Sequence, residues 1–253
     1  MGEGTLLDLK KTVHENAAHY YEKAKDLRRK AKNAVDAMKK TEREIGSAEI
    51  QNAPERKIRI KREKHWYERF HWFKAGEFMV LAGRDAKQNE ILVSRYFEDK
   101  DLFFHADIHG APTTILRGGT IAPEDVLKGA AQFAASYSSA WKQGMNNVDV
   151  YAVERNQVSK EAQGEYVGKG GFIISGKRRW FRNTELSLVL EIDEKGLLVC
   201  EPAVLNAKPG SLKITPGNTE KGKAGKDIAN VFNISVDDVL SALPSGSFSY
   251  RRG

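Results

Sequence analysis

The stretch that decides the fold is Asp101–Leu116, which reads DLFFHADIHGAPTTIL. In an extended chain, successive side chains point to opposite faces of the strand. Leu102 and Phe104 therefore lie on one face, while Phe103 and His105 lie on the other. A Gly-Ala-Pro turn follows this strand-like segment, and the residues Thr-Thr-Ile-Leu after the turn form a second strand-like segment. The stretch predicts two strands of a sheet, the first of them with an apolar face.

Three polar side chains stand on the second face of the first strand, and they raise a chemical question. His105, Asp107 and His109 are a metal-ligand set, an acid–base set or a polar recognition cluster. On a straight strand, side chains at i and i+4 lie roughly 13 Å apart, so at most two adjacent members can share an ion. We therefore favour the polar cluster, either a recognition surface or a hydrogen-bonded structural cluster, and expect no bound metal.

The composition describes a basic protein of 253 residues with a formal net charge of +7. Cys200 is its single cysteine, which excludes an internal disulfide and any multi-cysteine metal site and fits a reducing compartment. The sequence has no run of about 18 apolar residues and no apolar leader, so we expect a cytoplasmic protein outside the membrane. Residues 1–65 hold 17 Lys or Arg against 11 Asp or Glu, a difference of +6, and this charge fits either a polyanionic partner or a solvated helix face.

Small and apolar side chains recur every three or four residues in the first part of the chain. The two rows are Ala17, Ala24, Ala31, Met38 and Ile45, and Tyr20, Leu27, Ala34 and Thr41. Such heptads predict a long helix with an alanine-rich coiled-coil seam. Gly46 ends the pattern, and Pro54 permits a second helix over Glu55–Phe73, which predicts an antiparallel hairpin. The basic outer face of the hairpin would carry Arg56, Lys57, Arg59, Lys61, Arg62 and Lys64.

Aromatic residues mark the end of this second predicted helix. Trp66, Phe70 and Phe73 are spaced as on one helical face, which predicts core packing. Beyond them, short strand-like runs alternate with helices. One helix is predicted from Pro123 to Gly144, and a last one is predicted with Ser235 as its N-cap and Pro244 as its stop.

Residues 208–226 are rich in Pro, Gly and Lys, which predicts a polar loop outside the core. Together these patterns predict an α+β fold. We expect three parts: the coiled-coil hairpin over 1–65, a mixed α+β domain over 66–195, and a C-terminal extension over 196–253 with the basic loop and the terminal helix.

The motif GRDAKQNE follows a strand that ends at Gly83. Asp85 is placed to cap the helix that begins after it. Arg84, Asn89 and Glu90 are polar residues suited to hydrogen bonds with phosphates or base edges. The structural and the RNA-binding interpretations of this motif stay open together.

Cations surround two aromatic residues in Gly176–Arg182, which reads GKRRWFR. Lysine and arginine neutralise phosphates, while aromatic rings offer faces on which unpaired bases stack. This predicts one RNA-binding surface, although a basic hairpin with two residues turned inward is the alternative. The surface would be formed by Lys177, Arg178, Arg179, Trp180 and Arg182, with Lys160 beside them.

Taken in order, these motifs resemble the NFACT family, some of whose members carry the older name fibronectin-binding protein. WYERFHWF, GRDAKQNE, DLFFHADIHGAP, DVYAVERNQVSK, GEYVGKGGFIISGKRRW and ITPGNTEKGKAGK resemble its C-terminal NFACT-R domain, in the form found in archaeal homologues of RqcH and NEMF. The N-terminal heptads resemble part of the coiled-coil arm that precedes that domain. Nothing resembles the family's N-terminal NFACT-N and helix-hairpin-helix modules, so we expect a C-terminal fragment rather than a stand-alone protein.

The resemblance implies a role in ribosome-associated quality control and the rescue of stalled ribosomes. Such proteins bind large ribosomal subunits that carry peptidyl-tRNA and recruit tRNA for C-terminal tailing of the stalled chain. We expect RNA-binding residues at Arg84, Asp85, Asn89, Glu90, His105, Asp107, His109, Lys160, Lys177, Arg178, Arg179, Trp180 and Arg182. We expect no enzyme and no cofactor, and the seam of the arm would allow a homodimer.

Two alternatives of other classes stay open. One is a metal-assisted RNA-processing enzyme that uses His105, Asp107 and His109. The other is a protein-interaction scaffold that recruits a partner through the coiled coil.

Overall fold

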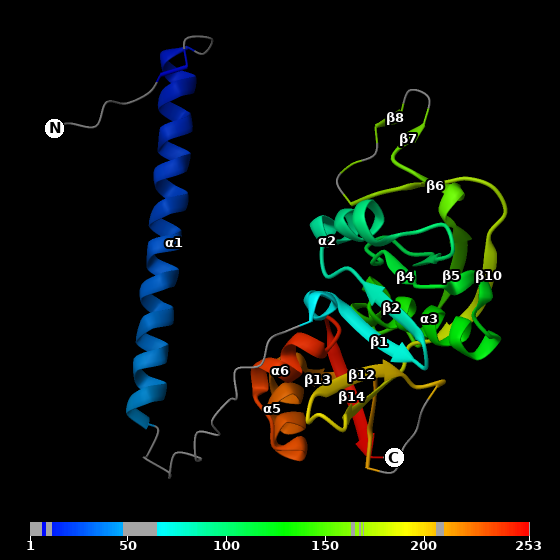
Figure 1. Cartoon of the computed structure of the whole chain (residues 1–253). Helices are drawn as coiled ribbons and strands as arrows, with labels where there is room; N and C mark the ends of the chain where they lie inside the picture. The colour runs from blue at the N-terminus through cyan, green and yellow to red at the C-terminus, as the bar shows by residue number, and fades with distance from the viewer. Residues whose placement is uncertain are drawn as a thin grey trace. The chain divides into compact units, whose positions relative to one another are not determined.

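The computed structural model describes residues 7–8, 12–47, 65–162, 165–166, 168, 170–205 and 210–252. The chain divides into two compact units, Met1–Arg62 and Glu63–Gly253, and each is described by itself. Figure 1 shows the elements of both units.

The first unit contains one long helix, α1, at Val13–Ser47. Its start is closed by a capping box, because the Thr12 N–H donates to a Glu15 carboxylate oxygen at 2.8 Å and the Glu15 N–H donates to Thr12 Oγ1 at 3.3 Å. The helix predicted from the heptads is therefore confirmed, and its seam residues Leu27 and Met38 are exposed. The first ten residues of the second predicted helix, 55–64, which include its six basic residues, lie outside the described residues.

The prediction that residues 65–73 continue this helix is wrong. Trp66–Arg69 form a short 3-10 helix, η1, and His71–Ala75 form strand β1. Phe70 and Phe73 are fully buried as predicted, but they belong to two different hydrophobic clusters, and Trp66 is 46% exposed. The helical spacing misled because Phe73 instead follows strand alternation opposite Val80.

The second unit is built on a six-stranded antiparallel sheet with the strand order β1-β2-β4-β3-β5-β10. Its strands besides β1 are β2 Phe78–Ala82, β3 Leu102–Ala106, β4 Thr114–Leu116, β5 Asn147–Glu154 and β10 Arg179–Glu185. The two strands predicted from the opening stretch are β3 and β4, paired directly with Phe103 opposite Ile115. Leu102 and Phe104 face one side and Phe103 the other, as the alternation predicted.

Helix α3, Glu124–Ser136, covers the first face of this sheet. The helix predicted from Pro123 to Gly144 divides in two, because Ser138 starts the separate helix α4, Ser139–Lys142, by accepting the Ala140 N–H at 3.2 Å. The opposite face is covered by α2 at Ala86–Ile91, by the π-helical turn η2 at Leu92–Tyr96 and by the chain around Phe172.

A second, four-stranded sheet has the order β12-β11-β13-β14. Its strands are β11 Leu188–Ile192, β12 Leu198–Pro202, β13 Leu212–Glu220 and β14 Ser247–Arg252, and the helices α5 Lys221–Phe232 and α6 Val236–Ala242 pack beside them. The predicted N-cap of α6 is confirmed, since Ser235 Oγ accepts the Asp237 N–H at 3.3 Å.

The predicted loop over residues 208–226 is wrong, because its described part forms β13 and the start of α5. Leu212, Ile214 and Ala224 from this segment are buried in the core. The prolines and glycines misled because β13 pairs on both sides and accommodates Pro216 at a register shift.

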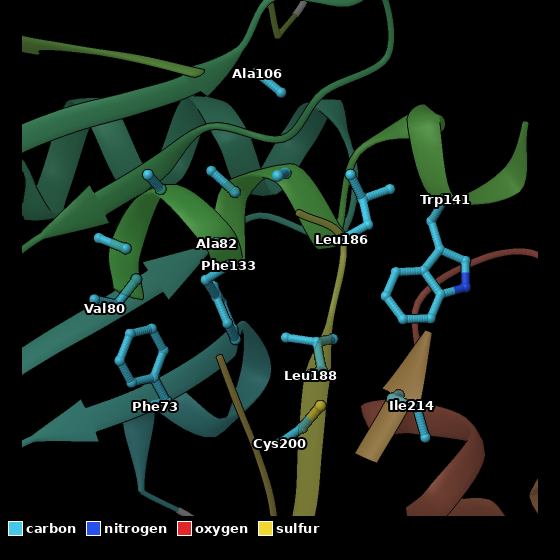
Figure 2. Packing of buried hydrophobic residues seen from close by; sticks show 14 of the residues in the cluster. Phe73, Val80, Ala82, Ala106, Phe133, Trp141, Leu186, Leu188, Cys200 and Ile214 are labelled. Atoms are coloured by element: carbon cyan, nitrogen blue, oxygen red, sulfur yellow. The ribbon is translucent and has the colours of Figure 1, made fainter. Parts of the chain in front are cut away.

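One hydrophobic core joins the first face of the six-stranded sheet to the second sheet. Figure 2 shows Phe73 and Phe133 gathered with Leu188, Cys200 and Ile214. The remaining short elements are η3 Gly119–Ile121, η4 Arg155–Gln157, β6 Val158–Ser159, β7 Glu161–Ala162, β8 Glu165–Tyr166 and β9 Ile173–Ile174. Within the described ranges, no helix combines the length and the apolar character that a membrane crossing requires.

Candidate nucleic-acid interface

Three rings form a row across the second face of the six-stranded sheet. In the register of β3, β5 and β10, His105 lies opposite Tyr151, and Tyr151 lies opposite Trp180. The His105 and Tyr151 ring centroids are 5.8 Å apart, and those of Tyr151 and Trp180 are 5.5 Å apart. Directly opposed residues are the closest neighbours between antiparallel strands, so the strand pairing itself builds this row.

Two arginines flank the row: Arg178, directly before β10, and Arg182, within β10. The Arg178 guanidinium carbon lies 4.6 Å from the Tyr151 ring centroid and 5.9 Å from that of Trp180, while that of Arg182 lies 3.9 Å from Trp180. Both are two residues from Trp180 in the sequence, so strand alternation puts all three side chains on one face. We call His105, Tyr151, Trp180, Arg178 and Arg182 the aromatic–arginine row.

Asp149 holds the far end of this row in place. Its carboxylate accepts from Arg182 Nη1 at 2.6 Å and from the Asn183 N–H at 2.7 Å. The Asn183 bond, with the Arg182 bond after it, lowers the pKa of Asp149. Arg182 is therefore oriented by an ionised partner while its side chain stays exposed.

The residues of the predicted basic surface lie on both faces of the sheet. Arg179 points to the opposite face, where it pairs with Glu124 and lies 5.6 Å from the Phe181 ring centroid. Lys177 is exposed in the turn before β10, and the Gln157 side-chain amide donates to the carbonyl of Lys177 at 2.9 Å. Because β10 alternates, consecutive residues of GKRRWFR cannot share one face.

A pocket of about 610 Å³ adjoins the row. Three segments form its walls: residues 83–89 at the start of α2, residues 108–113 after β3, and Gly168 with residues 170–174. Phe103, His105 and Tyr151 of the sheet also line it. We call this space the loop pocket, and it brings together the motifs GRDAKQNE, HGAP and GKGG.

The residues predicted in GRDAKQNE mostly build the walls of this pocket. Arg84 donates to three backbone carbonyls, Ser241 at 2.6 Å and Arg69 and Phe70 at 3.1 Å each. Asn89 Oδ1 accepts the Thr113 N–H at 3.1 Å. The structure thus gives both side chains internal partners, where the sequence left them available for RNA.

The two acidic residues of the same motif also have structural contacts. The prediction that Asp85 caps α2 is confirmed, since its carboxylate accepts the Gln88 N–H at 2.8 Å. Glu90 pairs with Lys160 and accepts the Gly170 N–H at 3.2 Å, which ties the glycine-rich segment to α2.

His105, Asp107 and His109 do not form one cluster. β3 ends at Ala106, so Asp107 and His109 are exposed in the following turn, whereas His105 is largely enclosed. Burial lowers the pKa of His105, which is therefore neutral at pH 7. No group of three His, Cys, Asp or Glu within the described ranges is placed to hold a metal ion, so the metal-assisted enzyme has no ligand set there.

Sequence reasoning missed three contributors. Tyr151 connects the row to the pocket, Phe172 lines the pocket, and Gln157 holds the turn that carries Lys177. Tyr151 was recognisable as a strand residue in DVYAVE, but its position opposite His105 depends on a strand register that the sequence does not reveal.

Comparison with known proteins agrees with the resemblance of the motifs. Residues 69–176 match a family described as NFACT protein RNA binding domain. The archaeal Rqc2 homolog aRqcH of Methanocaldococcus jannaschii is 38% identical over 206 residues, covering 75% of this chain and 30% of the relative. The human ribosome quality control complex subunit NEMF is 32% identical over 194 residues, covering 72% of this chain and 18% of the relative.

The chain therefore spans less than a third of the length of these relatives. The structure of the C-terminal part of the fibronectin/fibrinogen-binding protein from Streptococcus suis aligns with a TM-score of 0.40 and 21% identity, over 69% of this chain and 77% of that one.

Proposed function

Because the chain carries an NFACT-R domain, we propose that it is the RNA-binding module of a ribosome-associated quality-control factor. In this proposal the whole protein works in the cytoplasm on large ribosomal subunits that carry peptidyl-tRNA. The module contacts ribosomal RNA or tRNA there and supports tRNA recruitment for C-terminal tailing. It binds and positions RNA, and no catalytic step is assigned to it.

The observation that carries the proposal is the aromatic–arginine row. Trp180 lies between Arg178 and Arg182 and stays partly exposed, so a base can stack on the ring while the guanidinium groups neutralise the adjoining phosphates. Arginine suits this position because its planar, permanently charged group both stacks on rings and binds phosphate with two donors.

The remaining predicted residues take different parts in the proposal. Asp107 and His109 are exposed near the row or the pocket and are placed to contact RNA. Lys177 instead lines a separate hollow with Arg179, on the opposite face of the sheet. Arg84, Asp85, Asn89, Glu90 and Lys160 are positioning residues that hold the pocket walls. The basic residues Arg56–Lys64 and a homodimer through α1 stay predictions.

The test is fluorescence anisotropy with labelled tRNA over a salt series. Arg178→Gln removes one cation from the row, whereas Arg179→Gln removes one from the opposite face, so the two variants have the same net charge. We expect Arg178→Gln to weaken binding by about threefold to tenfold and to reduce the salt slope by about 1, because one phosphate contact is lost. We expect Arg179→Gln to stay within about twofold of the unchanged protein.

Equal losses in the two variants would show that only net charge matters and would remove the row from the interface. Absence of binding to tRNA and to large ribosomal subunits alike would overturn the proposed function.

A further inference from the structure

The loop pocket has the size and the walls of a site for one small organic group. Its volume of about 610 Å³ lies within the range of about 300–1,000 Å³ typical of ligand sites. His105 and Phe172 supply partly exposed aromatic surface with the buried rings of Phe103 and Tyr151 beside them, and the loop segments supply backbone polar groups. Ligand sites of this kind combine apolar stacking surface with a few fixed polar groups.

The walls of the pocket are held together by close backbone contacts. A Cβ at Gly170, whose φ is +81°, would lie 2.7 Å from Ala86 Cα, so only glycine lets this segment pack on the start of α2. A Cβ at Gly83 would lie 2.9 Å from the Asn89 nitrogen. With Glu90 and Asn89 bonded across the same walls, the pocket is formed in the folded protein before any ligand enters.

The pocket is continuous with the aromatic–arginine row. Tyr151 lines the pocket and also lies between His105 and Trp180 in the row. If one base of an RNA strand stacks on Trp180, the neighbouring nucleotides of that RNA lie close to the pocket. His105 and Tyr151 both line the pocket with their ring centroids 5.8 Å apart, so an aromatic surface continues from the row into the pocket.

From this arrangement we propose that the loop pocket binds one unpaired nucleotide of an RNA strand, with its base inside and its backbone running toward Arg178. The inference rests on the proposed RNA-binding function and adds the kind of RNA recognised. A base in a duplex is stacked on both sides and paired along its edge, so it cannot enter a pocket of this kind. The module should therefore select single-stranded RNA over duplex RNA.

The experiment compares two labelled RNAs, a twelve-nucleotide single strand rich in uridine and a blunt twelve-base-pair duplex, at one salt concentration. Counterion release alone favours the duplex, since its charge density is higher. The proposal predicts the reverse, with the single strand bound at least about tenfold more tightly, because base stacking is available only to it.

A pocket-filling variant and a matched control locate the site. Gly168 and Gly222 are both exposed, a Cβ at either position meets no atom within 4 Å, and neither has a φ in the left-handed region. Gly168 lines the pocket, whereas Gly222 lies on α5 outside it. Thermal unfolding of Gly168→Trp and Gly222→Trp establishes that both variants fold.

We expect Gly168→Trp to reduce the preference for the single strand to below about threefold and Gly222→Trp to keep it, since only the first indole stands at the wall of the pocket, where it competes with a base for the same space. Equal or tighter binding of the duplex by the unchanged protein overturns the inference while RNA binding itself stands. A preference that survives in Gly168→Trp also overturns it, because the base must then bind elsewhere. Absence of binding to either RNA removes the proposed function and the inference together.

Discussion

One face of the six-stranded sheet, the closed face, is covered by α3 and joined to the second sheet. The other face is covered by α2 and η2 over only part of its width and carries the aromatic–arginine row and the loop pocket beside them, so we call it the open face. Both faces are rich in rings, but the rings have different surroundings. On the closed face Phe73 and Phe133 pack 4.8 Å apart and are excluded from water. On the open face Trp180 has arginines beside it and stays partly exposed.

In this comparison the surroundings of a ring, rather than its presence, separate rings packed in the core from rings left accessible at the surface. Phe181 and Trp180 are neighbours in the sequence, yet Phe181 packs on the core residue Phe104 at 5.6 Å and Trp180 lies in the row. Aromatic side chains bury large apolar areas in a core, and the same rings offer stacking faces where one side is left open.

The largest effect is expected on the closed face. Phe133→Ala removes a fully buried ring from the core, which should lower the free energy of unfolding by about 3–5 kcal/mol through the lost apolar burial and the cavity left behind. Urea unfolding followed by circular dichroism measures the loss. Ile121→Ala, at a side chain 79% exposed, is the control and should change stability by less than about 0.5 kcal/mol. Similar values for the two would contradict the assignment of α3 to the core.

A smaller effect, on affinity rather than stability, is expected on the open face. Trp180→Ala should weaken RNA binding by about tenfold because a stacking ring is lost, and Trp180→Phe should recover most of it. Trp66→Ala is the matched control, since Trp66 is also partly exposed but stacks on Tyr96 away from the row. Anisotropy titrations that gave equal losses for Trp66→Ala and Trp180→Ala would break the distinction between the faces.

The smallest expected effect concerns pH and the closed face. His71 stacks on Tyr137 with ring centroids 4.0 Å apart, and burial, with Arg84 and Lys221 adding to it, holds its pKa well below the ordinary value of 6.5. Below about pH 6.5 the His71 imidazole binds a proton in the unfolded chain but not in the folded chain. The free energy of unfolding therefore decreases as the pH is lowered through this range, by at most about 1.4 kcal/mol per pH unit.

His71→Phe keeps a ring and removes the proton site, so its stability should change less between pH 7 and pH 5.5, measured by urea unfolding at each pH. His109→Phe, at an exposed position of the loop pocket, is the control and should keep the steeper dependence. A slope that is unchanged in His71→Phe would show that other groups cause the acid sensitivity.

The parts of the fold that could be predicted depend on short-range patterns. Alternation placed Phe103 and Phe104 on opposite faces, and a capping serine marked the start of α6, because both follow from local backbone geometry. The stripe of Trp66, Phe70 and Phe73 failed because helical spacing and strand alternation with a turn can share the same apolar positions.

The candidate site could be predicted only in part. Single motifs pointed to Arg178, Trp180 and Arg182, and these do share one face. Arg84 looked equally available, but its donors go to carbonyls as distant in sequence as Ser241, which no local pattern reveals. The loop pocket depends on three segments meeting in space, and such long-range contacts are set by the packing of the whole domain.

The pairing of β10 with β5 has a consequence for how this domain can be cut. The matched RNA-binding region ends at residue 176, three residues before β10 begins at Arg179. A fragment ended there would leave β5, whose Val150 and Ala152 are buried, as an edge strand with unpaired backbone groups. It would also lose Leu188, Ile214 and Phe248 from the shared core. Such a piece should aggregate rather than fold, so the unit that folds by itself extends through β14.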